Sequence, residues 1–292
     1  IENDQASLVV DTARARSTAE AGVYAAIGDL QRSFGAKDPV ALVGQPRPYV
    51  FPTYRNVRGA EGLELAPSDT RKTSATVTIT DESGKINLNH APASVLQEIL
   101  GIDGAAARAI TASLPRSGAS PESSQQQRWL TNLDDLVSSN LLAPAQFAKV
   151  NPSFVTVYTV ADHANPKAFL NVNAAPPEVL AAVLGLPVET ARTVMAKRPF
   201  ASIPALGTAA GKDPATFNFK PDPNDPTGQP VALSFESRCF RIVSEAAYAM
   251  VKKDKDNKDL EDVRTRARAE AVVLFKPEGG YEIVCWNTQR DS

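Results

Sequence analysis

Histidine and cysteine are scarce in this chain of 292 residues, with two of each, and the short motifs that mark common catalytic sites are absent. The sequence has no GxSxG elbow, no HExxH pair, no phosphate-binding loop and no paired CxxC, so the standard catalytic constellations have no local signature. His90 and His163 each stand alone, which favours structural roles for both. We therefore predict that the chain is not an enzyme.

Long hydrophobic runs and an excess of one charge are also lacking. No apolar run approaches the roughly 20 residues that span a bilayer, and no signal peptide is recognisable. The 31 Lys and Arg residues nearly balance the 33 Asp and Glu residues, so nothing global indicates binding to nucleic acid or to an anionic membrane. Residue 1 is Ile and opens directly into a helical pattern, so we expect the natural start to lie further upstream.

The two cysteines, Cys239 and Cys285, lie in short β-like runs near the end of the chain. An even pair fits a single disulfide in an oxidising compartment, and two buried thiols are the alternative. We expect the disulfide, which would close a loop of about 45 residues and stabilise the fold by about 3–4 kcal/mol.

The remaining pattern predicts helices and strands in separate blocks. Apolar residues at helical spacing predict one helix over residues 5–34, and strict alternation predicts a half-buried strand over residues 73–80. Between them, residues 35–72 carry five prolines and predict an irregular surface excursion, with room for one or two strands that the sequence does not place. Helices are predicted from about residue 90 to about residue 205, and a Pro/Asp/Asn-rich linker is predicted over residues 211–230.

Three strands are predicted at the end of the chain, over the runs CFRIVSEAAYAM, VRTRARAEAVVLF and YEIVCW, as an antiparallel meander. The predicted fold class is therefore α+β, with an antiparallel sheet domain interrupted by an all-α insertion. Residues 1–85 are expected to hold the long helix, a variable loop and the first strand or strands of the sheet. Residues 86–210 form the predicted insertion, and residues 211–292 form the linker and the closing strands.

The turn between the first two closing strands is acidic, with five Asp or Glu residues within residues 254–262. The spacing of Asp254 and Asp256 suggests a calcium loop, but Asp259 stands where such a loop has glycine. Four lysines nearby also oppose a cation. We expect a solvated hairpin tip, with calcium at Asp254, Asp256 and Asp259 as the weaker alternative and no other cofactor.

An internal repeat organises the helical block, because residues 86–115 align without gaps on residues 170–199. Each copy runs from an Asn-x-Asn segment into an apolar helix, which a glycine ends, and then into a second helix. This order predicts two helix-hairpin-helix-like repeats. The identical pairs include Asn87/Asn171, Asn89/Asn173, Pro92/Pro176, Leu96/Leu180, Gly101/Gly185 and Arg108/Arg192.

Helix-hairpin-helix units often bind DNA through the N–H groups of the hairpin, so a periplasmic DNA-binding or receptor protein is the alternative function. The DNA-binding pattern has a second glycine in the hairpin, where this chain has Asp103 in one copy and Pro187 in the other. Asp103 would repel a phosphate, and Pro187 has no N–H to donate. We therefore expect no nucleic acid partner.

Four segments carry a family resemblance: DESGKINLN, NVNAAPPEVL with KRPFASI downstream, SRCFRIVSEA, and the helix AEAGVYAAIGDL. Together they resemble the K-type minor pseudopilins of bacterial type II secretion systems. The resemblance implies a pilin-like domain, in which a long N-terminal helix packs on an antiparallel sheet, with an inserted α-domain. Many members carry an acidic Asp-Trp-x-Asp stretch and a Gly-Ala-Glu element after the first helical pair. This chain lacks both, so no calcium site is carried over from the family.

The resemblance also implies a function. Such proteins are structural components at the tip of the periplasmic pseudopilus, and they support protein export across the outer membrane. Their partners are other minor pseudopilins, of the I-, J- and H-types. A hydrophobic helix start, which this sequence does not include, anchors them in the inner membrane before assembly. The inserted domain is too bulky to stack within a filament, which favours the tip position.

The start of the predicted helix is the expected partner surface. Its Ala-rich stripe allows another helix to approach closely, and its N-terminal half should project beyond the sheet. The predicted interface residues are Leu8, Val9, Ala15 and Ala19. Ala26, nearer the sheet, is expected to lie in the core of the protein itself.

Overall fold

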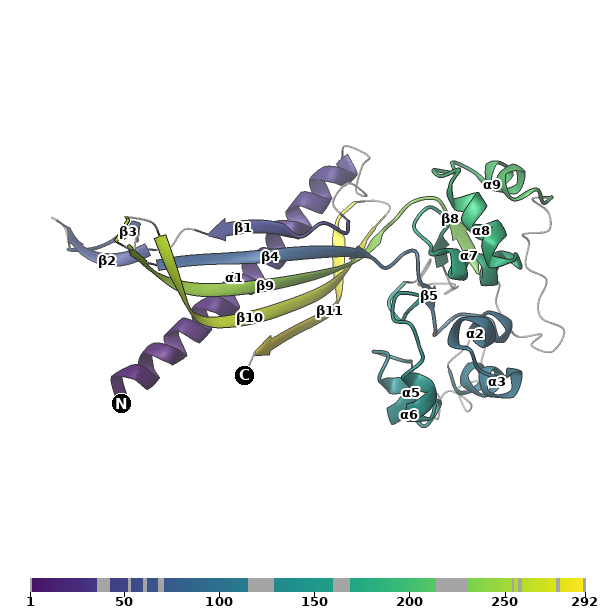
Figure 1. Cartoon of the computed structure of the whole chain (residues 1–292), viewed down its shortest axis with the longest axis horizontal. Coiled ribbons are helices and arrows are strands. Elements are labelled where there is room, and N and C mark those ends of the chain that lie inside the picture. Colours follow the sequence, from purple (N-terminus) through teal and green to yellow (C-terminus); the bar gives the residue numbers. More distant parts are fainter. Residues whose placement is uncertain are drawn as a thin grey trace. The chain divides into compact units, whose positions relative to one another are not determined.

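The chain divides into two units, which Figure 1 shows in a computed structural model. Ile1–Thr80 together with Phe240–Ser292 form the first unit, here called the sheet unit, and Asp81–Cys239 form the second, here called the inserted unit. The structure describes residues 2–35, 43–51, 54–59, 62–67, 71–114, 129–159, 169–213, 231–253, 255–256, 259–276 and 279–290. Each unit has a hydrophobic core of its own.

The sheet unit consists mainly of one long helix and a five-stranded sheet. Helix α1 (Glu2–Gly35) lies across one face of the sheet (Figure 1), as the sequence predicts. The strands lie in the order β1-β4-β9-β10-β11, and the pairs β1/β4 and β10/β11 are antiparallel. Their bounds are Arg47–Phe51 for β1, Arg71–Asp81 for β4, Cys239–Lys253 for β9, Asp259–Phe275 for β10 and Tyr281–Arg290 for β11. The three predicted closing strands are thus confirmed.

Small side chains bring α1 close to the sheet. A Cβ atom added at Gly22 would lie 2.3 Å from Ser244 Oγ and 3.1 Å from Ala75 Cβ, so a side chain there would require these neighbours to shift. The helix side of this core consists of Ala15, Ala19, Val23, Ala26, Ile27 and Leu30, which are buried against residues such as Val77, Ile79, Phe240, Ile242 and Val273.

Strands also occupy the segment that was predicted to be irregular. Within residues 35–72 lie β1, β2 (Tyr54–Gly59) and β3 (Gly62–Pro67), and β2 pairs with β3 in an antiparallel hairpin. Pro48 lies in β1, which pairs with β4 and forms one edge of the sheet. A proline is tolerated on an edge strand because its missing N–H is not needed on the open side. The prolines of this segment therefore do not exclude strands, and the structure places the strands that the sequence left open.

The two predicted helix pairs are present in the inserted unit. They are α2 (Ala93–Leu100) with α3 (Gly104–Ser113), and α7 (Pro177–Leu184) with α8 (Val188–Met195). Gly101 and Gly185 end the first helix of each pair in the left-handed region, with φ of 63° and 60°. Short helices α5 (Asp135–Ser138), α6 (Pro144–Phe147) and α9 (Ile203–Ala210) complete the described helices of this unit.

The prediction of an all-α insertion is wrong, because the inserted unit also contains two short parallel ladders. Strand β5 (Ile86–Asn87) pairs with β6 (Val155–Thr156), and β7 (Phe169–Asn171) pairs with β8 (Ala232–Ser234). Each partner lies more than 60 residues away in the sequence, so local patterns could not reveal the pairing.

The parallel ladders also move the domain boundaries from those predicted. Because β8 pairs with β7, the inserted unit continues past residue 210 to Cys239, and it begins at Asp81 rather than at residue 86. Most of the predicted linker, residues 214–230, lies outside the described residues.

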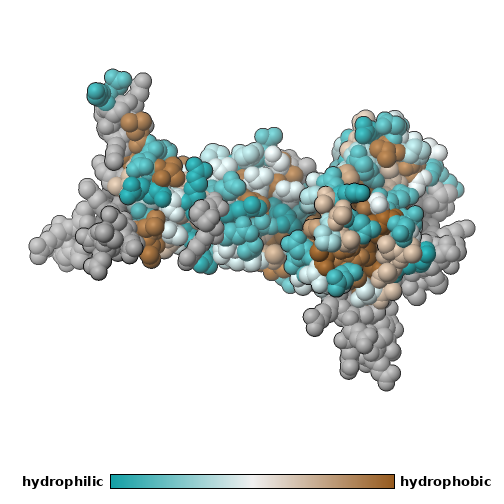
Figure 2. All heavy atoms as spheres, turned by 60° about the horizontal axis from the view of Figure 1, so that its bottom comes forward, coloured by the Kyte–Doolittle hydropathy of each residue, from teal (hydrophilic) through white to brown (hydrophobic). Residues whose placement is uncertain are grey.

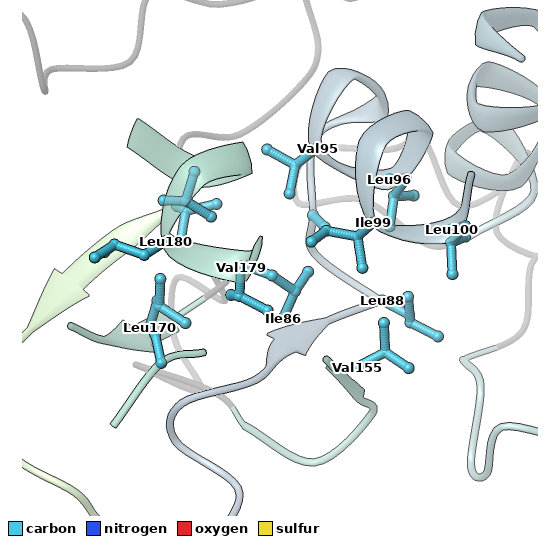
Figure 3. Close-up of a cluster of buried hydrophobic side chains, with 14 of the residues drawn as sticks. Ile86, Leu88, Val95, Leu96, Ile99, Leu100, Val155, Leu170, Val179 and Leu180 are labelled. Atoms are coloured by element: carbon cyan, nitrogen blue, oxygen red, sulfur yellow. The ribbon is translucent and has the colours of Figure 1, made fainter. Parts of the chain in front are cut away.

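Both helix pairs contribute to a single core in the inserted unit. Figure 3 shows Val95, Leu96 and Ile99 of α2 near Ile86 and Leu88, and near Val179 and Leu180 of α7. All of these side chains are less than a tenth exposed. The two repeats therefore stabilise each other by burying apolar surface, at about 25 cal/mol per Å².

Candidate assembly site

The start of α1 exposes consecutive apolar residues. Leu8, Val9 and Val10 are 56%, 69% and 47% exposed. Figure 2 shows apolar patches scattered over hydrophilic surface on one face of the molecule, so an exposed apolar side chain alone does not mark a binding site. Here the apolar residues adjoin a helix face that is buried further along the chain.

The buried face of α1 contains two of the four predicted interface residues. Ala15 and Ala19 are both 0% exposed and belong to the core of the sheet unit, so their prediction as partner contacts is wrong. Leu8 lies seven residues before Ala15, which is about two helical turns, and therefore on the same side of α1. Since Leu8 is exposed and Ala15 is buried, the cover that the sheet gives this side ends between them.

A polar contact lies where the sheet stops covering α1. Asp11 is 7% exposed and lies four residues before Ala15, on the same side of α1. Arg14 lies 3.4 Å from Asp11 and donates a hydrogen bond of 3.1 Å to the hydroxyl of Tyr248 on β9. The Arg14 guanidinium also lies over the Tyr248 ring, 5.5 Å from its centre. The chain before Asp11 therefore leaves its apolar residues uncovered by the described part of the sheet unit.

The Asn-x-Asn segments have a different role, which sequence reasoning missed. In the first repeat, Asn89 Oδ1 accepts the N–H of Leu130 at 2.8 Å, and Asn89 Nδ2 donates to the carbonyl oxygens of Leu130 at 3.0 Å and Val157 at 3.4 Å. Asn89 thus joins three segments that are far apart in the sequence. Asn87 Oδ1 accepts the N–H of Asn89 at 2.9 Å and orders the turn between them.

The second repeat reproduces these bonds with equivalent residues. Asn173 Oδ1 accepts the N–H of Phe200 at 2.7 Å, and Asn173 Nδ2 donates to the carbonyl oxygens of Phe200 at 2.9 Å and Phe235 at 3.0 Å. Asn171 Oδ1 accepts the N–H of Asn173 at 2.9 Å. Because the amides satisfy backbone groups of their own chain, these four residues, here called the asparagine frame, are structural.

The two hairpins do not present the donors that a phosphate needs. Asp103 caps α3, and its carboxylate accepts the N–H of Ala106 at 2.8 Å, so an anion already occupies that helix start. Pro187 stands at the corresponding place before α8 and has no N–H. The DNA-binding alternative therefore gains no support from the geometry.

The isolated histidine of the first repeat is packed in an apolar site. The ring of His90 lies 4.9 Å from that of Trp129, and burial lowers the pKa of His90 to about 4. The second repeat has Ala174 at the equivalent position, so the fold does not require an imidazole there. His163 lies outside the described residues.

Acid is expected to destabilise the inserted unit as the pH falls from about 6.5, the pKa of histidine in an unfolded chain, toward the folded-state value of His90. In this range the unfolded state binds a proton that the folded state excludes, so stability that is complete above the unfolded pKa is lost on acidification. His90→Ala should reduce the difference in unfolding free energy between pH 7 and pH 5. This difference can be measured by urea unfolding in a Trp286→Phe background, with Trp129 fluorescence as the signal. An unchanged difference would assign the effect to another group.

No disulfide joins Cys239 and Cys285, and the structure therefore contradicts the predicted bridge. Cys239 begins β9 and Cys285 lies in β11, with β10 between these strands. Two strand spacings amount to about 9.6 Å, which exceeds the Cα separation of about 7 Å that a disulfide can bridge. The sequence could show that both cysteines lie in strands, but it could not show the strand between them.

The predicted calcium residues are not brought together by what the structure describes. Asp254 lies outside the described residues, Asp256 is exposed in a turn, and Asp259 is the first residue of β10. In the described ranges, no cluster of three potential His, Cys, Asp or Glu ligands could hold a metal ion. Calcium binding at this turn stays a prediction.

The same ranges contain no helix with the length and apolar character needed to cross a membrane.

The fold, a long helix on an antiparallel sheet with a large insertion, is similar to that of a chain of known structure. The similar chain comes from the crystal structure of the GspK–GspI–GspJ complex of the type 2 secretion system of enterotoxigenic Escherichia coli. The likeness covers 99% of this chain and 98% of that chain, with a TM-score of 0.52 and 12% sequence identity.

A comparison with protein families identifies a family for part of the chain. A model described as type II secretion system (T2SS), protein K, matches residues 170–218, which include the second repeat. No curated protein matches the chain significantly. The family match and the shared fold confirm the resemblance to the K-type minor pseudopilins that the sequence indicates.

Proposed function

We propose that this chain is a structural minor pseudopilin that assembles with I-, J- and H-type minor pseudopilins at the tip of a periplasmic type II secretion pseudopilus. In this role it supports protein export across the outer membrane and catalyses no reaction. The match to protein K and the fold shared with a chain from a GspK–GspI–GspJ complex support the proposal. The observation that carries it is the uncovered apolar start of α1.

This start is suited to packing against a partner helix. Leu8 continues the side of α1 that is buried further along, so a partner covering Leu8 would extend an existing apolar face. Val9 and Val10 widen the surface around the helix. Full burial of a Leu or Val side chain contributes about 1.5–3 kcal/mol, so these three residues can supply a substantial part of a binding free energy.

The inserted unit has a structural role in this proposal. Its two helix pairs act as helix-hairpin-helix-like repeats that stabilise each other through a common core and through the asparagine frame. The unit spans Asp81–Cys239, which is more than half of the chain. A unit of this size hinders stacking of further subunits around it, and this favours the tip over the shaft of the filament.

Leu8→Glu is expected to weaken binding to the soluble domains of the I- and J-type partners at least tenfold, which corresponds to about 1.4 kcal/mol. The glutamate would place a charge in the apolar contact, while Leu8 is exposed enough in the free protein for folding to be unaffected. Isothermal titration calorimetry measures the affinity, and the melting temperature checks the fold.

Leu260→Glu is the matched control, because Leu260 in β10 is 58% exposed, close to the 56% of Leu8. It should bind the partners as the native chain does. Equal affinity of the Leu8 and Leu260 variants would show that the start of α1 is not the interface. Absence of binding by the native chain would contradict the proposed function itself.

A further inference from the structure

The segments that lead into and out of the inserted unit are joined by hydrogen bonds. Strand β4 ends at Asp81, and β9 begins at Cys239. The N–H of Glu82 donates to the carbonyl oxygen of Cys239 at 2.8 Å. The hydroxyl oxygen of Ser83 accepts the N–H groups of Arg238 and Cys239, both at 3.0 Å. The incoming and outgoing segments therefore lie side by side at the base of the unit.

Two buried side chains reinforce this junction. Ser83 is 0% exposed and Ser237 is 2% exposed. The Asp81 carboxylate accepts the N–H of Ser83 at 2.8 Å and the hydroxyl of Ser237. Burial raises the pKa of Asp81, and these hydrogen bonds oppose the shift. An acidic side chain held in such a site is stabilised by its partners rather than by water.

The second repeat also forms hydrogen bonds with this junction. The N–H of Asn171 donates to the carbonyl oxygen of Ser83 at 2.7 Å, and its Nδ2 donates to Ser237 Oγ at 2.6 Å. A Cβ atom at Gly84 would lie 2.6 Å from the carbonyl carbon and oxygen of Ala174, so this position has no room for a side chain. The DESGK segment is thus fitted directly onto the Asn-x-Asn turn of the second repeat.

We propose that Asp81, Ser83, Asn171 and Ser237 form a clasp that closes the inserted unit at its base and makes it a separate folding unit. All four residues belong to the inserted unit. The core of the inserted unit is built from residues 86–231, whereas the core of the sheet unit is built from residues before 80 and after 239, so the two cores share no residue. Stability lost in one unit is therefore confined to that unit.

The clasp also determines how a mechanical force on the chain reaches the helices of the inserted unit. A force applied along β4 and β9 enters the inserted unit at two adjacent points, and the hydrogen bonds between residues 81–83 and 237–239 resist their separation. While the clasp holds, these hydrogen bonds rather than the helix pairs resist such a force.

Hydrogen–deuterium exchange of the full chain tests the clasp. Ser83→Ala removes the hydroxyl oxygen that accepts two N–H groups, so amides of α2, α3, α7 and α8 should exchange about tenfold faster or more, while those of β10 exchange at the native rate. Ser74→Ala, on β4 of the sheet unit, is the matched serine control and should leave α2 and α7 unchanged.

A second variant makes the reciprocal test, with the substitution in the core of the sheet unit. Ala19→Glu should accelerate exchange in β10 and leave the inserted unit protected. Faster exchange in both units for either variant, or native exchange in α2 and α7 of Ser83→Ala, would overturn the proposal. Should Ser83→Ala not accumulate, Ser237→Ala replaces it as the clasp variant, because it removes the hydroxyl between Asp81 and Asn171, and the same outcomes apply.

Discussion

Ala15→Glu is expected to destabilise the sheet unit by about 4 kcal/mol or more, rather than to affect partner binding alone. Ala15 is 0% exposed and packs where small residues bring α1 close to the strands. A glutamate there would bury an unpaired charge and also overfill the contact, and each effect is among the few mechanisms that produce very large losses of stability.

Ala13→Glu is the control for this change, because Ala13 lies on the exposed side of α1 two residues away. It should change the unfolding free energy by no more than about 0.5 kcal/mol. Urea unfolding in a Trp129→Phe background follows the sheet unit through Trp286, whose ring lies 5.5 Å from that of Tyr24 on α1. A stable Ala15→Glu variant would contradict the position of α1 on the sheet.

Asn89→Ala is expected to destabilise the inserted unit by about 3–5 kcal/mol, because it leaves several buried backbone groups without partners. The N–H of Leu130 and the carbonyl oxygens of Leu130 and Val157 would all lose the Asn89 amide. An unsatisfied buried group costs about 1–3 kcal/mol, which is more than a hydrogen bond contributes on average.

Asn151→Ala is a suitable control for Asn89→Ala. Asn151 is exposed, and its side chain accepts a hydrogen bond of 2.9 Å from the N–H of Ser153. Loss of this hydrogen bond should lower the unfolding free energy by about 1 kcal/mol or less. Unfolding followed by Trp129 fluorescence, in a Trp286→Phe background, compares the two variants. Similar small losses for both would show that the asparagine frame is not what stabilises the repeats.

Local patterns predict much of this fold. The length of α1, the strand over residues 73–80 and the three closing strands follow from apolar spacing. The internal repeat gives the two helix pairs and the glycines that end their first helices. Such features depend on residues within a few positions of one another, so a single sequence contains them.

Features that depend on distant partners are not predictable in the same way. The parallel pairing of β5 with β6, the position of β10 between the two cysteines and the edge position of β1 depend on which segments meet in space. The assembly surface shows the same limit. Helical spacing places Leu8 and Ala15 on one side of α1, but only the end of the sheet makes one exposed and the other buried.

The most direct test of assembly through the start of α1 is site-specific photocrosslinking in secreting cells. A photoreactive residue at Val9 should form crosslinks to an I- or J-type minor pseudopilin. The same residue at Val50 on β1, which is also 69% exposed, should form none or far fewer. Equal crosslinking at both positions, or crosslinking only at Val50, would contradict the account.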